Sequence, residues 1–522
     1  MQMTLFQDFL MKTLHTPVEA ARWLRQRVTG QLRTDSRLVQ PGDAFIAWPG
    51  AATDGRLYLP SALQQGAHAC VLAQEGSEPW QALSEQDQAE HKLERLACMA
   101  DLKAQTGPIA AAYYEHPSEE LDVLAVTGTN GKTSSTWWLA QALSSPVLRS
   151  TCGLIGTLGV GQLPHLSSTG MTTPDPVLLQ HQFREFADAG LKYCAIEASS
   201  IGLAEHRLDG TRIRVAVFTN FTQDHLDYHG SMDAYWAAKA ALFNWSGLQA
   251  AVINIDDPQG AQLAQQLQTQ GLDVWTCSRQ GTARLQARPL PSTEGLSFEV
   301  SLAGQTFTLQ TDLIGDYNID NLLGVMGAVC ALGHSLQDAV QACAYLTAVP
   351  GRMQRVAALK TDAPLSVVDY AHTPDAIEKA LSALRALADQ RAGRLWCLLG
   401  CGGDRDPGKR PLMAAAAEAG ADHVVLTSDN PRTESPEAIL AAMAQGLKRV
   451  DQATRMVDRA SAIAWVMAQA QDEDVVLVAG KGHETYQEIQ GLRQPFSDVE
   501  QVQQALQRRA TDWSRTAQEG QA

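Results

Sequence analysis

The segment "LDVLAVTGTNGKTSST" at residues 121–136 joins an apolar run to a glycine-rich turn that ends in Gly-Lys-Thr. Gly128 and Gly131 allow the backbone amides of the turn to point at an anionic ligand, and a helix N-terminus behind them adds positive potential. Lys132 could reach the β- and γ-phosphates of a nucleotide, and the Thr133 hydroxyl could bind magnesium. The spacing is shorter than GxxxxGK[ST]. The apolar run before it and the helix-like "SSTWWLAQAL" after it nevertheless favour nucleotide binding over a structural glycine turn.

Two further polar clusters follow apolar runs in the same part of the chain. Glu197 closes the run in "YCAIEASS", where a charge is costly unless it meets a cation. Magnesium would satisfy it, and so would an ion pair with Arg207 or Arg212. In "FTNFTQDHLDYHG" the segment lacks cysteines, so we interpret His225 as a magnesium or phosphate-side group rather than a zinc ligand.

A lysine lies among aromatic residues in "DAYWAAKAALFNW". Tyr235, Lys239 and Phe243 are four residues apart, which places them on one stripe of a helix. From spacing alone, the favoured interpretation is a snorkelling lysine that keeps its ammonium in water.

Three charged turns in the last third of the chain also follow apolar runs. They are "GCGGDRDPGKRP" with Arg405, "SDNPRTE" with Arg432, and "AGKGHETY" with Glu484. Arginines bind carboxylates, while acidic and amide groups bind ammonium. Each turn alone is typical of solvated surface, but together they favour a pocket for an amino acid with an additional acidic group.

The elements that must position these residues read as an α/β fold. Short β-rich runs alternate with polar turns and helical patterns, which is typical of a parallel sheet with crossover helices. "LSFEVSLAGQTFTLQT" alternates with period two and predicts a β-hairpin. Breaks near His116-Pro117 and Pro350-Gly351 predict three domains, residues 1–115, 116–349 and 350–522. Because ligands bind beyond the carboxyl ends of parallel strands, we expect the polar clusters to face a shared cleft.

Composition bounds the class of protein. The 522 residues allow about three domains, and 45% hydrophobic residues allow more than one core. A net charge of −16 argues against a nucleic-acid partner. The N-terminal segment carries Asp8 and lacks a signal-peptide pattern, no apolar run reaches the ~20 residues of a membrane span, and the cysteines are scattered. These features predict a cytoplasmic protein with reduced, mostly buried thiols.

A series of motifs resembles the Mur ligases of peptidoglycan synthesis over nearly the whole chain. The motifs are "TGTNGKTS", "EASSIGLAEHR", "TNFTQDHLDYHG", "GDYNIDN", "PGRMQRV", "DYAHTPDA", "GCGGDRDPGKRP", "DNPR" and "GKGHETYQ". "DNPR" is similar to the members that add diaminopimelate rather than lysine. The resemblance implies a small N-terminal α/β domain that binds UDP, a central P-loop ATPase domain with a mainly parallel sheet, and a C-terminal Rossmann-like α/β domain for the amino acid.

The resemblance also implies roles for individual residues. Catalytic roles fall on Lys132, Glu197, His225 and Lys239, the last as a carbamylated lysine, which reverses the snorkelling interpretation. The ligands of Mg²⁺ would be Thr133, Glu197, His225 and the carbamate of Lys239. ATP would meet Gly128, Thr129, Asn130, Gly131, Lys132, Thr133, Ser134 and Asn321. The UDP-muramoyl dipeptide would meet Thr34, Ser36, Thr172, Thr173, Ser199, Glu205 and Arg207. Diaminopimelate would meet Arg405, Asp429, Asn430, Pro431, Arg432, Gly480 and Glu484.

The chain departs from the family pattern at a few positions. Relatives carry Gln at Glu205, Asn at Met171 and His at Ile201, and they carry polar side chains where this chain has Ala51-Ala52-Thr53. These departures concern contacts with the UDP-sugar.

The implied activity is ATP-dependent amide formation through an acyl phosphate, with magnesium as cofactor, in a monomeric cytoplasmic enzyme that supports cell shape and division. Closure of the C-terminal domain over the central domain would exclude water. Alternatives are a lysine-adding ligase, a ligase that adds D-Ala-D-Ala, folylpolyglutamate synthase, or a nucleotide-binding regulator without ligase activity. A regulator would not need the second metal site implied by Lys239.

Overall fold

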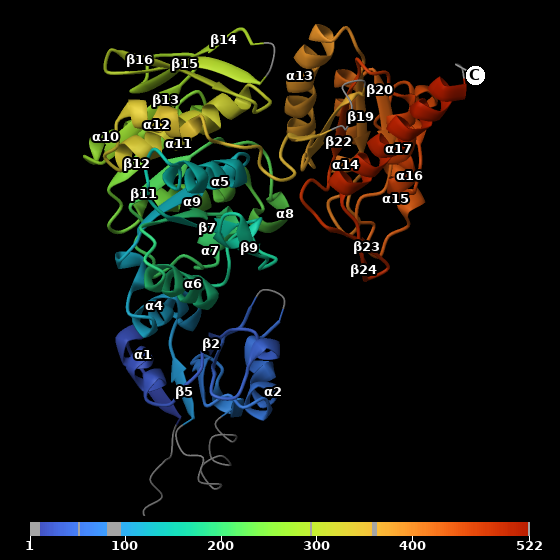
Figure 1. Cartoon of the computed structure of the whole chain (residues 1–522). Coiled ribbons are helices and arrows are strands. Elements are labelled where there is room, and N and C mark those ends of the chain that lie inside the picture. Colours follow the sequence, from blue (N-terminus) through green and yellow to red (C-terminus); the bar gives the residue numbers. More distant parts are fainter. Residues whose placement is uncertain (1–10, 51–52, 81–94, 293–294, 358–362, 520–522) are drawn as a thin grey trace, which may run out of the picture. The chain divides into compact units, whose positions relative to one another are not determined.

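The structure is a computed structural model that describes residues 11–50, 53–80, 95–292, 295–357 and 363–519, with side chains to residue 510. It divides into two compact units, Met1–Trp275 with Ala331–Gly333, and Thr276–Cys330 with His334–Ala522. Figure 1 labels the elements along the chain. Ala51 and Ala52, where the sequence departs from the family pattern, lie outside the described residues.

The first part of the chain forms a five-stranded parallel sheet of order β1-β5-β4-β3-β2. Its strands are β1 (Lys12–Leu14), β2 (Leu32–Arg33), β3 (Ala44–Ala47), β4 (Ala69–Ala73) and β5 (Leu96–Met99). Its helices are α1 (Pro17–Arg25), α2 (Leu59–Gln64) and α4 (Leu102–Tyr113), with short 3-10 turns η1 (Ser36–Leu38) and η2 (Gly55–Tyr58). Strands β3 and β4 are almost wholly buried, as expected for a parallel sheet covered by helices.

The central sheet has eleven strands in the order β16-β15-β14-β13-β12-β11-β6-β10-β7-β8-β9. They are β6 (Asp122–Thr127), β7 (Cys152–Gly156), β8 (Gly159–Gln162), β9 (His165–Ser167), β10 (Tyr193–Glu197), β11 (Val215–Phe218), β12 (Ala250–Asn254), β13 (Asp273–Ser278), β14 (Leu285–Leu290), β15 (Leu296–Leu302) and β16 (Gln305–Thr311). The run β12-β11-β6-β10-β7 is parallel. The predicted hairpin is confirmed as the antiparallel pair β15–β16.

The central part of the chain also contains α-helices and 3-10 turns. They are η3 (Pro117–Glu119), α5 (Lys132–Leu143), α6 (Pro176–Asp188), α7 (Ser200–Ala204), α8 (Leu226–His229), α9 (Met232–Ala240), η4 (Ala241–Asn244), α10 (Pro258–Thr269), α11 (Tyr317–Ala331) and α12 (Leu336–Cys343). Asp175 and Asp257 each accept hydrogen bonds from two backbone amides of the first turn, and a proline follows each of them. Aspartate satisfies amides that have no helical partner, and proline at the first position has no amide to satisfy.

The last part of the chain forms a six-stranded sheet of order β17-β18-β22-β19-β20-β21, parallel except for β17. Its strands are β17 (Gln354–Val356), β18 (Leu365–Asp369), β19 (Leu395–Leu399), β20 (His423–Leu426), β21 (Thr454–Arg455) and β22 (Val475–Ala479), and the hairpin is β23 (Tyr486–Ile489) with β24 (Leu492–Pro495). Its helices are α13 (Pro374–Gln390), α14 (Lys409–Gly420), α15 (Pro436–Ala444), η5 (Val450–Gln452), α16 (Arg459–Gln469) and α17 (Asp498–Glu519).

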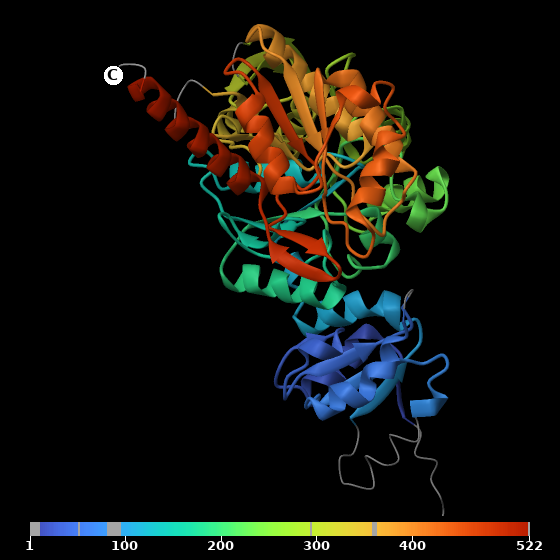
Figure 2. The ribbon, with the colours of Figure 1, turned by 90° about the vertical axis from the view of Figure 1, so that its right-hand side faces the viewer.

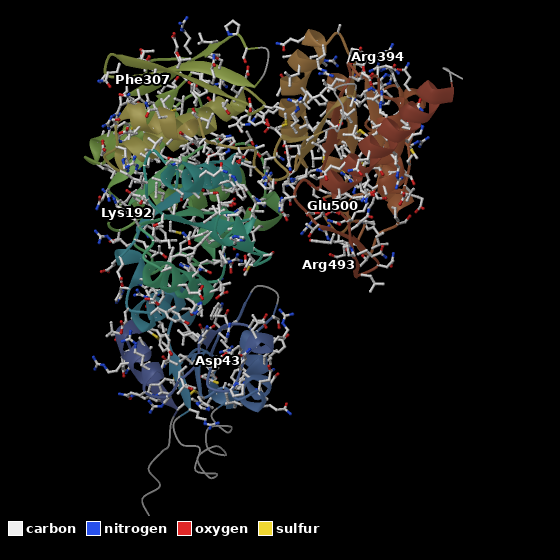
Figure 3. The ribbon with its side chains drawn as sticks, viewed as in Figure 1. Asp43, Lys192, Phe307, Arg394, Arg493 and Glu500 are labelled. Carbon is white, nitrogen blue, oxygen red and sulfur yellow. The ribbon has the colours of Figure 1, made fainter. Side chains whose placement is uncertain are left out.

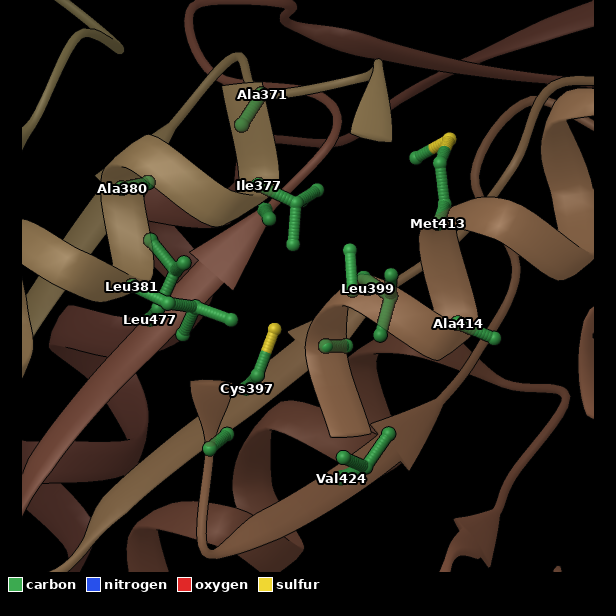
Figure 4. Close-up of a cluster of buried hydrophobic side chains, with 14 of the residues drawn as sticks. Ala371, Ile377, Ala380, Leu381, Cys397, Leu399, Met413, Ala414, Val424 and Leu477 are labelled. Carbon is green, nitrogen blue, oxygen red and sulfur yellow. The ribbon is translucent and has the colours of Figure 1, made fainter. Parts of the chain in front are cut away.

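Helices cover both faces of this last sheet, and β22 shows why. Val475 and Leu477 belong to a core packed under α13, α14 and α15, part of which is shown in Figure 4. Val476 and Val478 belong to a second core under α16 and α17, the long helix drawn in red in Figure 2. Successive side chains of a strand point to opposite faces, so a run without polar residues requires a helical layer on each side. The predicted α/β class with mostly parallel sheets is confirmed.

All nine cysteines are free and buried, which confirms that interpretation of the scattered thiols. Within the described ranges, no helix combines the length and the apolar character needed to cross a bilayer.

Candidate active site

The glycine-rich turn connects β6 to α5 in the predicted context. Gly128 has φ of +149° and packs so tightly that a Cβ there would lie 1.9 Å from Thr219 Oγ1. Only glycine suits both conditions. The ammonium of Lys132 folds over the turn and donates to the carbonyls of Gly128 at 2.9 Å and Thr129 at 2.8 Å. The Asn220 segment after β11 supports the turn, because its carbonyl accepts the Thr129 amide at 2.8 Å.

Glu197 lies beside this turn because β10 pairs with β6, with Glu197 opposite Val126. The side chain is 1% exposed. Its Oε2 accepts from the hydroxyls of Thr133 at 2.9 Å and Thr157 at 3.2 Å, and its Oε1 accepts from the Thr157 amide at 2.8 Å. Its hydrogen bonds within the described part of the chain come from these neutral donors, not from Arg207 or Arg212. The Thr133 hydroxyl and the Glu197 carboxylate together offer the hard oxygen ligands that magnesium prefers.

Lys239 reaches the same turn from α9. Its side chain is 1% exposed, its Nζ donates to the Gly128 carbonyl at 2.7 Å, and it lies 4.5 Å from the centroid of the Tyr235 ring. Tyr235 and Phe243 are also buried, although Phe243 lies on η4, after α9 has ended. The snorkelling interpretation is therefore wrong, because the turn covers the end of the side chain. Burial, followed by the charge of Lys132, holds the pKa of Lys239 well below its ordinary value.

His225 lies near Lys239 on the loop after β11. Its ring centroid is 6.0 Å from that of Tyr235, and its Nε2 is 3.5 Å from Asp224 Oδ2. Burial lowers the pKa of His225, and Lys132 and Lys239 lower it further, against the opposing charge of Asp224. A neutral imidazole is the form that binds a metal ion.

Four of the residues predicted to bind the muramoyl dipeptide surround Glu197. Thr173 Oγ1 donates to the Glu197 carbonyl at 2.7 Å and lies 2.9 Å from Ser199 Oγ. Arg207 donates to the Thr173 carbonyl at 2.9 Å. Thr172 Oγ1 lies 3.0 Å from Thr157 Oγ1. These contacts connect the residues predicted to bind the dipeptide to Glu197, which lies beside the phosphate loop.

The remaining predicted residues of the first unit lie elsewhere in it. Glu205 forms an ion pair with Lys103 of α4 at 2.7 Å and accepts a short hydrogen bond from the Tyr228 hydroxyl. Thr34 follows β2, where its hydroxyl bonds the Asp175 carboxylate, and Ser36 is buried in η1.

In the second unit, two loops at the carboxyl ends of β20 and β22 contact each other. We call them the 429 loop (residues 429–432) and the 480 loop (residues 480–484). Asn430 Nδ2 donates to Glu484 Oε2 at 2.8 Å, and the fully buried Lys481 Nζ donates to Asn430 Oδ1 at 3.0 Å and to Glu484 Oε2 at 2.9 Å. Gly480 has φ of +114°, and a Cβ there would lie 2.6 Å from Asp429 Oδ2. Acid, amide and lysine are thus held in one network.

Both predicted arginines flank the turn after β19. A Cβ at Gly402 would lie 2.9 Å from Arg432 Nη1 and 3.6 Å from Arg405 Cγ. Arg432 donates to the Gly403 carbonyl at 2.6 Å. Its backbone has φ of +52° and is held by the hairpin β23–β24, through Glu488 O at 3.0 Å and Gln490 N at 2.7 Å. Pro431 of the same loop is buried.

Asn321 lies on α11 in the second unit, where it is buried and donates to Asn318 Oδ1 at 2.9 Å. Two participants were missed by sequence reasoning, Thr157 and Asn220, both of which follow strand ends. Lys481 belongs to the charged turn "AGKGHETY" that the sequence singles out.

The fold and the phosphate loop define a class, an α/β protein built to hold a nucleotide phosphate beside a buried carboxylate. Comparisons with known proteins identify the family. Residues 126–329 match the Mur ligase middle domain, residues 351–482 the Mur ligase glutamate ligase domain, and residues 30–101 the catalytic domain of the Mur ligase family. The UDP-N-acetylmuramoyl-L-alanyl-D-glutamate–2,6-diaminopimelate ligase of Acidovorax sp. (strain JS42) is 57% identical over 504 residues, 95% of this chain and 98% of that protein.

Two relatives of lower sequence identity also match more than nine-tenths of this chain. The ligase of the same name from Pseudomonas aeruginosa is 45% identical over 494 residues, 92% of this chain and 96% of that protein. A solved structure of a UDP-N-acetylmuramoyl-L-alanyl-D-glutamate–2,6-diaminopimelate ligase is 36% identical, with a TM-score of 0.63, and covers 92% of this chain and 95% of its own. The chain belongs to the Mur ligase family, whose members are ATP-dependent ligases.

Proposed function

We propose that this chain uses ATP to join meso-2,6-diaminopimelate to the D-glutamate γ-carboxylate of UDP-N-acetylmuramoyl-L-alanyl-D-glutamate, a step of peptidoglycan synthesis. The names of its relatives support the substrates. The observation that carries the proposal is the joined pair of loops in the second unit, which presents Arg432 beside Asp429, Asn430 and Glu484. An arginine for a carboxylate and acidic or amide groups for an ammonium suit a zwitterion with an additional acid.

Arg432 favours diaminopimelate over L-lysine. L-Lysine lacks the second carboxylate and would leave the guanidinium without that ligand. Sites built to pair a polar group can reject an analogue that lacks it by roughly 10⁴-fold.

The reaction takes two steps. An oxygen of the γ-carboxylate attacks the γ-phosphorus of ATP, an O–P bond forms, and ADP leaves with the bridging oxygen. The amine of diaminopimelate then attacks the acyl carbon, the C–N bond forms, phosphate leaves and the nitrogen loses a proton. The first step brings two anions together, so the charge of Lys132 at the phosphate turn stabilises it.

Thr133 and Glu197 fit a magnesium ion, and we assign His225 and a carbamate on Lys239 to metal ligation as well. Bound Mg²⁺ neutralises phosphate charge. Lys239 supports a carbamate because its amine is buried and its pKa is lowered, which leaves a nucleophilic nitrogen. That nitrogen attacks carbon dioxide, an N–C bond forms and one proton is released, which turns a neutral amine into an anion.

The remaining assignments follow the family pattern. We place UDP against Thr34 and Ser36, the dipeptide against Thr172, Thr173, Ser199 and Arg207, and adenine near Asn321. We retain the division into domains at residues 1–115, 116–349 and 350–522. Nine free, buried cysteines support a reducing compartment and hence the cytoplasm.

One assay tests the proposal. Phosphate release from ATP is measured with the UDP-muramoyl dipeptide and each of meso-diaminopimelate, L-lysine and D-Ala-D-Ala. We expect release only when the dipeptide and meso-diaminopimelate are both present. Turnover with L-lysine or D-Ala-D-Ala instead would assign a different ligase, and release that ignores both substrates would contradict ligase activity.

A further inference from the structure

Arg459 and Asp498 form an ion pair that is wholly inside the second unit. Arg459 begins α16 and Asp498 begins α17, and both side chains are 0% exposed. The guanidinium binds the carboxylate in a bidentate manner, from Nε to Oδ1 and from Nη2 to Oδ2, each at 2.7 Å. A buried pair loses hydration at both charges, and apolar residues of similar volume stabilise a core at least as well. Such a pair therefore calls for a reason other than stability.

The remaining donors of Arg459 point to that reason. Its Nη1 donates to the Ser428 carbonyl at 3.1 Å, and its Nη2 donates to the Ala479 carbonyl at 2.9 Å. Ser428 is the residue before the 429 loop, and Ala479 is the residue before the 480 loop. One rigid guanidinium thus fixes the starting points of both loops.

The sheet order makes this link necessary. Strands β20 and β22 are not neighbours, because β19 lies between them. The chain leaves β19 at Gly400, where a Cβ would lie 2.7 Å from the Asp429 amide. Past that point, among the described residues, no ladder of backbone hydrogen bonds spans from β20 to β22, and Arg459 provides a bridge there.

The two loops are therefore joined in two places. Arg459 binds the carbonyls before them, and the Asn430–Glu484 and Asn430–Lys481 hydrogen bonds join their side chains. The first link is buried and its donors are used within the protein. Arg459 cannot touch a substrate, so any effect on catalysis is exerted through the loops.

We propose that the Arg459–Asp498 pair is a positioning device that sets the separation of the 429 and 480 loops and thereby the affinity for the amino-acid substrate. The proposal rests on the proposed function, in which these loops bind that amino acid. Misplacement of binding groups by about 1 Å can cost around 100-fold.

Arg459→Lys is the primary variant, because it keeps the charge but replaces a four-contact fork by a single ammonium. Asp498→Asn is the second, because it keeps the shape of the partner. Arg509→Lys is the matched control. Arg509 joins α17 to Asp472 at 2.6 Å and to the carbonyls of Met467 and Ala470, away from both loops.

The full chain is assayed for kcat and for KM of each substrate, and melting temperatures are recorded in parallel. We expect Arg459→Lys to raise KM for the amino acid by about 10- to 100-fold, with KM for ATP within about twofold. We expect a smaller rise for Asp498→Asn and none for Arg509→Lys, even where its melting temperature falls as far. If the first two variants lose melting temperature but keep KM for the amino acid, the pair is only structural and the proposal is overturned; if Arg459→Lys does not fold, Asp498→Asn decides.

The wild-type assay separates this inference from the proposed function. If the wild type accepts L-lysine or D-Ala-D-Ala in place of meso-diaminopimelate, the proposed substrate is wrong. The KM ratio is then measured with the accepted substrate, and a rise in Arg459→Lys still supports positioning while an unchanged value overturns it.

Discussion

Lys239 in the first unit and Lys481 in the second are both buried lysines, yet their side-chain nitrogens meet different partners. Lys481 donates to a carboxylate, Glu484, and to the amide oxygen of Asn430. Lys239 donates to the carbonyl of Gly128 and lies over the Tyr235 ring. The 480 loop thus balances its charge within the protein, whereas the phosphate-loop site buries a lysine against neutral groups.

The same contrast applies to the acids. Glu484 is paired with Lys481, but Glu197 accepts from the neutral groups of Thr133 and Thr157. A buried anion with neutral donors gains further from a cation. The second unit thus pairs a buried cation with a buried anion, and the magnesium ion and carbamate of the proposed function would supply such a pairing at the phosphate loop.

The largest effect is expected from a substitution of Lys239, which tests this contrast at the phosphate loop. Lys239→Ala should reduce kcat by roughly 10³-fold or more, because it removes the amine on which the proposed carbamate would form and place charge against the phosphates. Formate or acetate should restore part of the activity by supplying the missing carboxylate. Phosphate release measures both.

Lys192→Ala is the control for that experiment, since Lys192 is exposed and lies 5.0 Å over the Tyr193 ring. It should keep wild-type activity. Full activity of Lys239→Ala, or equal stimulation of the wild type by formate, would contradict the carbamate.

The next effect concerns the second unit. Arg432→Ala should lower kcat/KM for meso-diaminopimelate by about 10²- to 10⁴-fold, because the second carboxylate would lose the partner that the proposed function assigns to it. Equilibrium binding of ATP should survive. Arg493→Ala is the control. Arg493, labelled in Figure 3, lies exposed on β24 of the hairpin that holds the Arg432 backbone, and it pairs with Glu488 at 3.3 Å. Unchanged ligation by Arg432→Ala would show that the 429 loop does not select the substrate.

Sequence reasoning found the residues that follow strand ends but not all of their contacts. The β6-turn-α5 unit and the buried stripe of Tyr235 and Lys239 were predictable, because apolar runs, glycines and helical spacing are local signals. The depth of Lys239 was not, because spacing defines a face of a helix but not what covers it. The covering segment, at Gly128, is 111 residues away in the chain.

Contacts that depend on the order of the strands in a sheet could not be predicted from the sequence either. Thr157 binds Glu197 because β7 pairs with β10, although the two residues are 40 apart in sequence. Arg459 and Asp498 are 39 apart and begin different helices, so each reads as an ordinary charged residue. Pairing order depends on packing of the whole sheet, and no local pattern encodes it.

A moderate effect tests how neutral donors prepare Glu197. Thr157→Ala removes the hydroxyl that binds Glu197 Oε2 and lies beside Thr172 Oγ1, but keeps the backbone amide on Oε1. Loss of one such hydrogen bond costs about 1 kcal/mol, so we expect the magnesium concentration for half-maximal activity to rise about fivefold. Thr306→Ala, in the exposed part of the hairpin β15–β16, should leave it unchanged. An equal magnesium requirement in both variants would separate Thr157 from the metal site.

The last effect concerns stability at low pH rather than activity, and it tests whether the second unit tolerates one more positive charge near Lys481. Burial, together with the charges of Arg352 and Lys481, lowers the pKa of His483 to about 3. The unfolded chain, with a histidine pKa near 6.5, binds a proton below that pH while the folded chain does not. Stability from His483 is therefore complete above about pH 6.5 and is lost as the pH falls toward 3, by at most about 1.4 kcal/mol per pH unit.

His483→Gln removes this titration. Urea denaturation between pH 4.5 and 7 measures the free energy of unfolding of both proteins. As the pH falls, this free energy should decrease less steeply in the variant than in the wild type, and the difference in slope should reach at most about 1.4 kcal/mol per pH unit, the value for one proton. Near pH 7 the difference in free energy of unfolding between the two proteins should no longer change with pH. Parallel curves down to pH 4.5 would mean that the loops accept a protonated imidazole, and the contrast between a balanced second unit and an unbalanced phosphate site would then no longer hold at this position.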